Sequence, residues 1–314
     1  PGSERKAVSL SEYQVIQSLV NQVSWSKLST QILSLQNNDT ISGWDALGSR
    51  YTLNTARWFP KTKSILNAFQ SYGLTADYEY FTYSGYTNLR NVVAIQNGSD
   101  TSGYYIICAH CDSISGLASV GGPAPGADDN ASGTAAILEV ARILSQQQFR
   151  YPIRYIAFGA EEQGLIGSVT CANQAYYAGD SIFGVINLDM IAYESSSLSK
   201  DIIGNPASEW LVDAMIANNS TYNIGIDTIR KIIDASIWQS DHSPFWNKGY
   251  PAILGIEHYY PSNPYYHTVN DTLATLNLPL LTKMTRLSLA TIAELAGIIL
   301  TPTAVRPIHW QLYP

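Results

Sequence analysis

Short apolar runs alternate with longer stretches of helical spacing along most of this chain. The apolar runs predict buried strands at Ala76–Thr82, Leu89–Gln96, Tyr104–Ala109, Ile153–Gly159, Ile182–Leu188, Thr228–Ile233 and Ala252–Ile256. Apolar residues that recur every three or four positions predict helices at Tyr13–Val20, Leu28–Leu35, Thr55–Tyr72, Thr134–Gln147, Pro206–Ala217 and Leu280–Leu300, and another that ends near Tyr177. A capping box at Ser9 and Glu12 precedes the first helix.

Strands that alternate with helices are typical of an α/β domain. We expect one domain over residues 1–314, with a helical N-terminal segment of about residues 9–72 packed on it. Its sheet should be mixed and parallel at its middle, with helices on both faces in a three-layer α/β/α arrangement.

Carboxylates and imidazoles gather where the predicted strands end. Three successive strands lead into His110 and Asp112, into Glu161 and Glu162, and into Asp189. Asp128 lies in the glycine- and proline-rich loop after the first of these strands, and His267 lies in a later loop. In open α/β sheets this edge is where ligands bind. Because only 14% of the residues are charged, such a concentration indicates a bound cation.

The chemistry of these side chains narrows the choice of cation. Oxygen and nitrogen ligands without a thiolate suit zinc, manganese or cobalt better than calcium. Two histidines and three carboxylates exceed the needs of one catalytic zinc, and fit two metal ions about 3.5–4 Å apart with a bridging carboxylate. A further carboxylate that binds no metal is then free to act as a general base.

Composition excludes some functions and favours a cellular location. The net charge is −7 and the pI is near 5.2, so nucleic acid is not expected as a partner. No apolar run reaches the length of about 20 residues that a membrane span needs. The low charge favours a secreted or periplasmic protein, whose signal peptide would have been removed. Of the three cysteines, Cys108 and Cys111 have no matching second pair, so we expect buried thiols.

The order of the motifs resembles one known family. H-x-D-S, P-G-A-D-D-N-A-S-G, A-E-E-x-G-L-x-G-S, L-D-M, S-D-H and Y-H-T-x-x-D-T follow one another from roughly Asn88 to Leu273. This series resembles the co-catalytic dizinc aminopeptidases of the bacterial leucyl aminopeptidase type. The resemblance implies a hydrolase that binds two zinc ions, for which cobalt or manganese can substitute, and releases the first residue of peptides with a free N-terminus.

The resemblance also implies a role for each site residue. Asp128 would bridge both metals, and a cis peptide bond would join it to Asp129. The other predicted ligands are Glu162 and His267 for one metal, and His110 and Asp189 for the other. Glu161 would be the general base. Asp112, two residues after His110, is a further candidate for the catalytic group, and we expect it to orient the His110 ring rather than to bind metal.

Apolar residues near the predicted ligands indicate a pocket for the first side chain of the substrate. These candidates are Met190, Leu254, Ile256, Tyr260 and Tyr266. The chain departs from the family at Ile237, where some members have a tyrosine that donates to the oxyanion, and at Ala235 and Gln239, where some have cysteines. We expect a monomer.

Three other functions compete with this interpretation. A glutaminyl cyclase shares the fold and most of these residues but uses one zinc, and a tryptophan tends to precede its last histidine, where this chain has Tyr266. A carboxypeptidase of related fold usually carries an additional domain. A catalytically dead binding ectodomain would have lost metal ligands, and this chain has retained them.

Overall fold

A computed structural model describes residues 8–37, 47–194, 199–258 and 262–300. Its main sheet has the strands β1 (Thr75–Tyr83), β2 (Tyr86–Gln96), β3 (Tyr104–His110), β5 (Ile153–Phe158), β6 (Ile182–Asp189), β7 (Ser199–Gly204), β8 (Thr228–Ile233) and β9 (Ala252–Glu257). The strands β4 (Gln148–Phe149) and β10 (Ile298–Ile299) form a separate antiparallel pair. The helices are α1 (Leu10–Val20), α2 (Trp25–Gln36), α3 (Thr55–Ser71), α4 (Gly133–Leu144), α5 (Ile166–Ala178), α6 (Glu209–Thr221), α7 (Ser243–Trp246) and α8 (Leu278–Ala296).

The order of the strands places the chemistry at the middle of the sheet. From one edge to the other it is β1-β2-β5-β3-β6-β9-β7-β8. The four central strands β5, β3, β6 and β9 are parallel to one another, whereas β1, β2 and β7 join antiparallel to their inner neighbours. The prediction of a mixed, centrally parallel sheet is therefore confirmed. All seven residues of β3 are buried, as its uninterrupted apolar run indicates.

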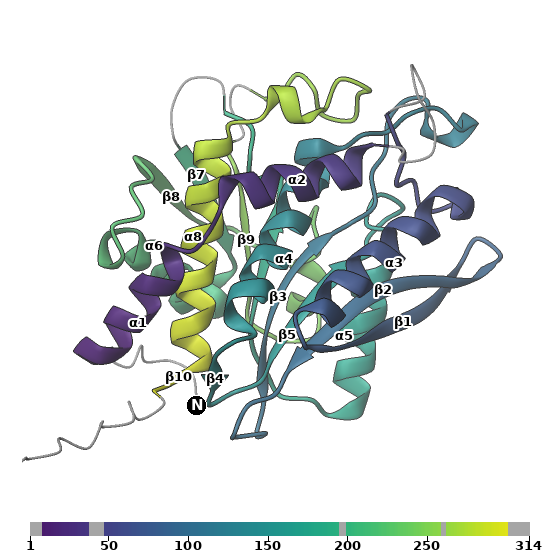
Figure 1. The fold of residues 1–314 in the computed structure, drawn as a ribbon. Helices are drawn as coiled ribbons and strands as arrows, with labels where there is room; N and C mark the ends of the chain where they lie inside the picture. Colours follow the sequence, from purple (N-terminus) through teal and green to yellow (C-terminus); the bar gives the residue numbers. More distant parts are fainter. Residues whose placement is uncertain (1–7, 38–46, 195–198, 259–261, 301–314) are drawn as a thin grey trace, which may run out of the picture.

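Helices cover both faces of the sheet. In Figure 1, α1, α2, α3, α4 and α8 lie in front of it and α5 lies behind. The front layer encloses the larger core, to which α6 also contributes. The smaller core behind the sheet packs Cys171 and Ala175 of α5 and Phe245 of α7 against β3, β5 and β6. The three-layer arrangement follows from these two cores, because each buries one apolar face of the sheet.

Local signals explain where several elements begin and end. The capping box before α1 is confirmed, since the Glu12 amide donates to Ser9 Oγ over 3.2 Å and the Ser9 amide donates to the Glu12 carboxylate over 2.8 Å. The last helix is shorter than predicted and ends at Ala296, because Gly297 adopts a left-handed conformation with φ of 69°. The three cysteines are free and buried.

One strand of the main sheet was not predicted, nor was the short pair β4 and β10. The strand β7 carries Ser199, Lys200 and Asp201 in its first half, so its sequence shows no apolar run. All six of its residues are nevertheless buried between β9 and β8. Partners elsewhere in the fold allow this burial: the Asp201 carboxylate forms a two-point ion pair with Arg230 of β8, with two N–O distances of 2.7 Å.

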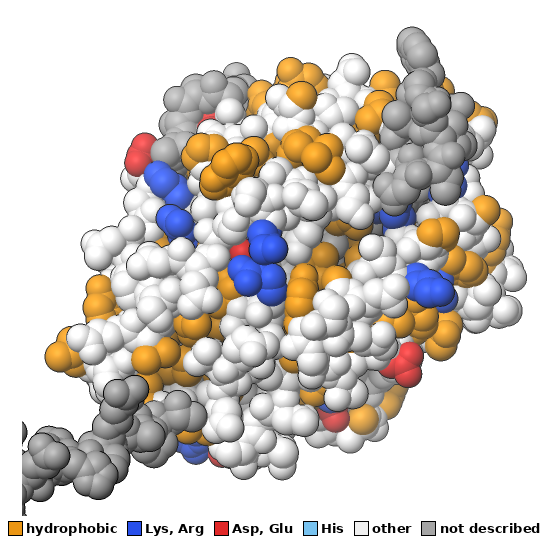
Figure 2. Space-filling view, in the orientation of Figure 1, with side chains coloured by type: hydrophobic (Ala, Val, Ile, Leu, Met, Phe, Trp, Pro, Cys, Tyr) orange, Lys and Arg blue, Asp and Glu red, His pale blue; other side chains and the backbone are white. Residues whose placement is uncertain are grey.

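The surface is poor in charge on the face that Figure 2 shows, where the few basic and acidic side chains are scattered. Within the described part of the chain, no helix is both long enough and apolar enough to span a bilayer.

A substitution at Gly133, the first residue of α4, tests how closely this helix packs against the sheet. A Cβ at Gly133 would lie 2.4 Å from the Leu188 carbonyl oxygen and 2.5 Å from Asn130 Oδ1, so Gly133→Ala must displace backbone. We expect a loss of about 1–3 kcal/mol in the free energy of unfolding, measured by urea denaturation. Gly116→Ala is the matched control, because a Cβ there meets no atom within 4 Å. Equal midpoints for the two variants would contradict this packing.

Candidate metal centre

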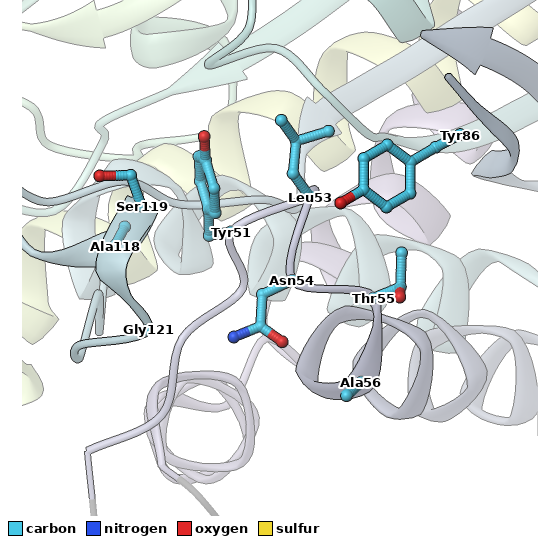
Figure 3. A pocket seen from close by; sticks show the side chains of 9 residues that line it. All are labelled: Tyr51, Leu53, Asn54, Thr55, Ala56, Tyr86, Ala118, Ser119 and Gly121. Carbon is cyan, nitrogen blue, oxygen red and sulfur yellow. The ribbon is translucent and has the colours of Figure 1, made fainter. Parts of the chain in front are cut away.

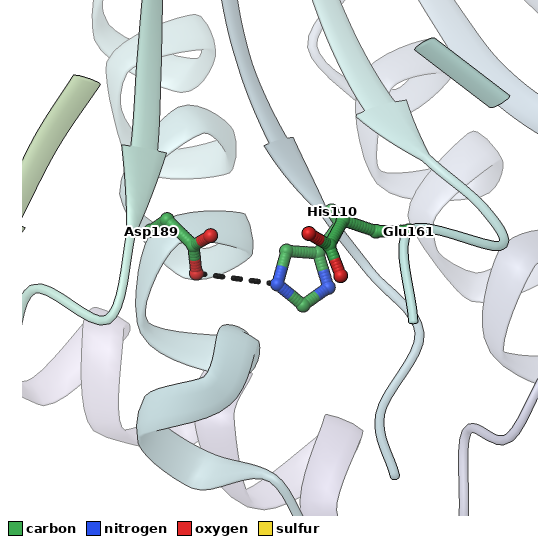
Figure 4. Close-up of side chains that lie close together, drawn as sticks. All are labelled: His110, Glu161 and Asp189. Atoms are coloured by element: carbon green, nitrogen blue, oxygen red, sulfur yellow. Dashed lines mark hydrogen bonds and ion pairs between the residues drawn. The ribbon is translucent and has the colours of Figure 1, made fainter. Parts of the chain in front are cut away.

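The parallel strands bring the predicted ligands to one edge of the sheet. His110 is the last residue of β3 and Asp189 the last residue of β6, and these two strands are neighbours. Glu161 and Glu162 follow β5, which lies on the other side of β3. Figure 4 shows the side chains of Asp189, His110 and Glu161 converging from these ends. His267 joins them from the loop after β9.

A first group of ligand atoms surrounds His110. Its Nε2 lies 3.2 Å from Asp189 Oδ1 and 3.1 Å from Asp129 Oδ1. Glu161 offers an oxygen to the same group, within 4.8 Å of ligand atoms on His110 and Asp189. His110 is almost fully buried, so these contacts are shielded from water.

A second group surrounds His267. Its Nε2 lies 3.1 Å from Asp129 Oδ2 and 3.1 Å from Glu162 Oε2. Asp129 therefore turns one oxygen toward His110 and the other toward His267. This is the position that a bridging carboxylate requires.

The structure corrects the prediction that Asp128 is the bridging residue. Asp128 Oδ1 accepts a hydrogen bond from the Ala192 amide over 2.8 Å, and its Oδ2 accepts from the Tyr193 amide and from Asn263 Nδ2. Both oxygens of Asp128 are therefore used to hold the segment after β6, and Asp129 takes the place between the histidines. Adjacent aspartates are indistinguishable by residue type, and only the path of the turn decides which one faces the site.

The predicted cis peptide is also displaced by one residue. The cis bond joins Asp129 to Asn130, not Asp128 to Asp129. It lies in the irregular turn Ala127–Ser132, which leads into α4.

Asp112 lies behind His110 rather than in the cavity. Its Oδ1 is 3.4 Å from His110 Nδ1, and the carboxylate accepts hydrogen bonds from Thr52 Oγ1 and from the amides of Glu161 and Glu162. Asp112 is fully buried. Its position fits the expected role of orienting the His110 ring.

Two further residues support the ligands. Ser240 Oγ donates to Asp189 Oδ2 over 2.6 Å. The carboxylate of Asp271 accepts hydrogen bonds from the amides of Asp128 and Asp129, over 2.8 and 3.0 Å. Both residues belong to motifs visible in the sequence, S-D-H and Y-H-T-x-x-D-T. Neither was predicted to have a role, because a motif does not show which distant groups its side chains contact.

A buried charge network lies beneath the site. Burial raises the pKa of Glu257 to about 11, with further contributions from Asp128, against the lowering effect of Lys200. The Lys200 side chain of β7 is fully buried, and this burial lowers its pKa. The carboxyl groups of Glu257 and Asp128 share a hydrogen bond, and burial raises the pKa of both. Neither this network nor β7 was predicted from the sequence.

Carboxyl groups outnumber imidazoles at the site, and their burial and crowding shift the pKa of several of these groups. Burial and the carboxylate of Asp129 raise the pKa of Glu162 to about 8. Burial also raises the pKa of Glu161 well above its usual value, although His110 opposes the shift. Burial lowers the pKa of His267, but Asp129 and Glu162 outweigh it and raise that pKa to about 10.

This excess fits divalent cations. Four carboxylates converge on two imidazoles: Asp129, Glu161, Glu162 and Asp189 around His110 and His267. In addition, Glu162 Oε1 is buried and has no hydrogen-bond partner among the described residues. A buried carboxylate oxygen without a partner is costly unless a cation is beside it. The donor set of oxygen and imidazole nitrogen is the one that zinc accepts.

A cavity of about 310 Å³ opens at the ligands. Of the predicted pocket residues, Met190, Leu254, Ile256 and Tyr266 line it, whereas Tyr260 lies outside the described residues. Ile237 lines it too, at the position where some of the aminopeptidases that the sequence resembles have a tyrosine. The Tyr266 ring stacks on His267, with 3.7 Å between ring centroids. The predicted pocket therefore adjoins the ligands at the described positions.

Comparison with known proteins places the chain in a family. The model of peptidase family M28 matches residues 91–292, which is more than half of the chain and includes each ligand candidate described above. The chain belongs to peptidase family M28.

Individual relatives of this M28 member agree with that assignment. A probable leucine aminopeptidase of Arthroderma otae is 29% identical over 66% of the chain and 57% of its own length. The LapA aminopeptidase of Legionella pneumophila has the same fold, with a TM-score of 0.74 at 20% identity over 94% of this chain and 75% of that one. A glutaminyl cyclase of Porphyromonas gingivalis shares the fold as well, with a TM-score of 0.67 at 20% identity over 87% and 99% of the two chains. The chain spans about half of the length of the curated relatives it matches.

A substitution of Asp271 tests how the loop that carries Asp129 is held in place. Asp271→Asn leaves one side-chain oxygen for the two amides that the carboxylate now binds, so the Asp129 loop should loosen. We expect divalent-metal affinity to fall about 10- to 100-fold, as for other residues that orient ligands, measured by competition with a chromogenic chelator. Asp227→Asn is the control, because Asp227 is exposed and lies before β8. Unchanged affinity in Asp271→Asn would show that the loop holds its shape without this carboxylate.

Proposed function

We propose that the protein is a zinc-dependent aminopeptidase that hydrolyses the first peptide bond of substrates with a free N-terminus. The observation that carries the proposal is the position of Asp129, with one oxygen toward His110 and the other toward His267. Membership of a peptidase family and the aminopeptidase names of several relatives support it.

We assign two zinc ions to the two groups of ligand atoms. His110 and Asp189 would hold one ion, His267 and Glu162 the other, and Asp129 both. When bound, such ions polarise a carbonyl group and lower the pKa of water. Cobalt or manganese should substitute, because the same oxygen and nitrogen ligands suit them.

Glu161 is the group that moves the proton. Glu162 is engaged with His267 through Oε2, whereas Glu161 lines the cavity beside His110 and Asp189. A carboxylate oxygen of Glu161 takes the proton of the attacking water and then gives it to the nitrogen of the departing amine. Metal ions nearby favour its ionised form and oppose the effect of burial.

The cavity beside Glu161 favours an apolar first residue. Met190, Ile203, Leu254 and Ile256 give it apolar walls. Such walls discriminate by only about 1–3 kcal/mol per methylene, so the enzyme should prefer rather than require leucine-like residues. Tyr266 is the tyrosine among the lining residues, and its hydroxyl is available as a donor where Ile237 offers none.

We also propose that the protein acts as a monomer outside the cytoplasm, in the periplasm or after secretion. Its low content of charged residues, 14%, supports this location. A glutaminyl cyclase remains the alternative within the same fold, and a catalytically dead binding protein remains the alternative without chemistry.

Substrate and metal measurements on the same preparation test this function. We expect release of nitroaniline from leucine p-nitroanilide, none from its N-acetylated form, two zinc ions per chain by elemental analysis, and loss of activity with a chelator that zinc restores. Cleavage of both substrates at equal rates would contradict an exopeptidase. One zinc per chain with ammonia release from N-terminal glutamine would establish the cyclase, and no turnover of any of these would indicate a binding protein.

Glu161→Gln separates chemistry from metal binding. The amide keeps the shape of the side chain but cannot accept the proton, so kcat should fall by about 10²–10⁴ while KM changes little. Bound zinc should stay at the wild-type level. Glu162→Gln should instead lose zinc, and Glu209→Gln, at an exposed site at the start of α6, should match the wild type. A Glu161→Gln variant that is active, or that has lost its zinc, would reverse the roles of the two glutamates.

A further inference from the structure

A second cavity, of about 430 Å³, shares none of its described lining residues with the cavity at the ligands. Three separate segments line it: the approach to α3, the start of β2, and the loop between β3 and α4. Figure 3 shows its principal side chains, Tyr51, Leu53, Asn54, Thr55, Tyr86 and Ser119. The volume is in the range of about 300–1,000 Å³ that is usual for ligand sites.

The register of the sheet places this cavity at the same edge as the metal centre. β2 runs antiparallel to β5, with Val92 opposite Ala157 and Gln96 opposite Ile153. Tyr86, the first residue of β2, therefore lies beyond the carboxyl end of β5, where Glu161 and Glu162 follow.

A pair of hydrogen bonds ties the wall of the cavity to the residue before the proposed general base and to Asp112. Thr52 lies between two lining residues, and its Oγ1 donates to Asp112 over 3.0 Å and accepts from the Ala160 amide over 3.1 Å. Ala160 immediately precedes Glu161. The wall thus adjoins the segment that carries the proposed base.

The two cavities lie on opposite sides of the ligands along this edge. The apolar wall of the first comes from Met190 after β6, Ile203 of β7 and Leu254 of β9. In the sheet, β3 and β5 separate these strands from β2 and Tyr86. A peptide whose first side chain fills the first cavity, and whose scissile bond lies at Glu161, has its remaining residues on the side of the second.

The chemistry of the second cavity suits a peptide main chain. None of the described residues that line it is charged. Tyr51, Tyr86 and Ser119 offer hydroxyl groups and Asn54 an amide, which can each donate to a carbonyl or accept from an N–H. Leu53 adds an apolar surface beside them. Such a lining recognises peptide groups without selecting the charge of the side chains.

We propose that this second cavity binds the part of the peptide substrate that follows the cleaved bond. The inference rests on the proposed aminopeptidase function. The cavity adapts the enzyme to oligopeptides. Residues after the first two raise kcat/KM, and a dipeptide such as Leu-Ala makes the least contact with the cavity.

The test compares substrates of increasing length. Leucine p-nitroanilide and the peptides Leu-Ala, Leu-Ala-Ala and Leu-Ala-Ala-Ala are assayed, the peptides by the release of leucine. For the wild type, kcat/KM should rise from Leu-Ala to Leu-Ala-Ala-Ala. For Tyr86→Ala, the ratio of kcat/KM for the tetrapeptide to that for the nitroanilide should fall about 3- to 10-fold, the loss expected for one or two hydrogen bonds.

Two further variants make the result specific. Tyr51→Phe removes only a hydroxyl group and should lower the same ratio in the same direction. Tyr177→Ala, on α5 behind the sheet and 80% exposed, should leave it at the wild-type value. A ratio that is unchanged in Tyr86→Ala and Tyr51→Phe, or wild-type rates that do not depend on length, would overturn the subsite while hydrolysis of the nitroanilide upheld the aminopeptidase. No hydrolysis of any of these substrates would instead refute the proposed function.

Discussion

The crowding of buried carboxylates around two imidazoles is the constraint on which the rest of the structure depends. Asp129, Asp189 and Glu162 each approach a histidine nitrogen within about 3.2 Å, and Glu161 lies beside them. In water these groups would repel one another and separate. Here His110, Asp189 and the two glutamates are fixed at the ends of β3, β6 and β5, because parallel neighbours in a sheet carry their carboxyl ends to one edge. Asp129 and His267 join them from loops.

Holding this arrangement requires support from distant parts of the chain. Asp271 fixes the amides of the bridging segment, Ser240 fixes Asp189, and Asp112 stands behind His110. Each support is itself buried and hydrogen-bonded, which keeps the cost of its desolvation low. The backbone of the site is therefore held rigidly, and each carboxylate is directed to a fixed position. This rigidity suits a metal centre, and it suits a general base that must stay unbound to the metal.

In the proposed aminopeptidase, the edge of the sheet also gives the substrate a direction. The apolar cavity lies on the side of β6, β9 and β7, and the uncharged polar cavity lies on the side of β2. The ligands and Glu161 lie between the two. Under the proposed function, the order of the strands places recognition of the first side chain and contact with the following peptide on opposite sides of one reacting bond.

The sequence by itself determined the class of fold, most of the strands and most of the candidate residues of the site, since apolar runs, helical spacing and ordered motifs are local properties of the chain. Tertiary structure decided what local patterns leave open. Asp128 and Asp129 are chemically identical neighbours, and only the turn Ala127–Ser132 turns the second toward both histidines. The polar strand β7 is buried with partners from distant parts of the chain, because Arg230 pairs with Asp201 and the carboxyl groups of Asp128 and Glu257 lie near Lys200. The second cavity combines segments from residues 51–56, 86 and 118–121, which no spacing along the chain could have brought together.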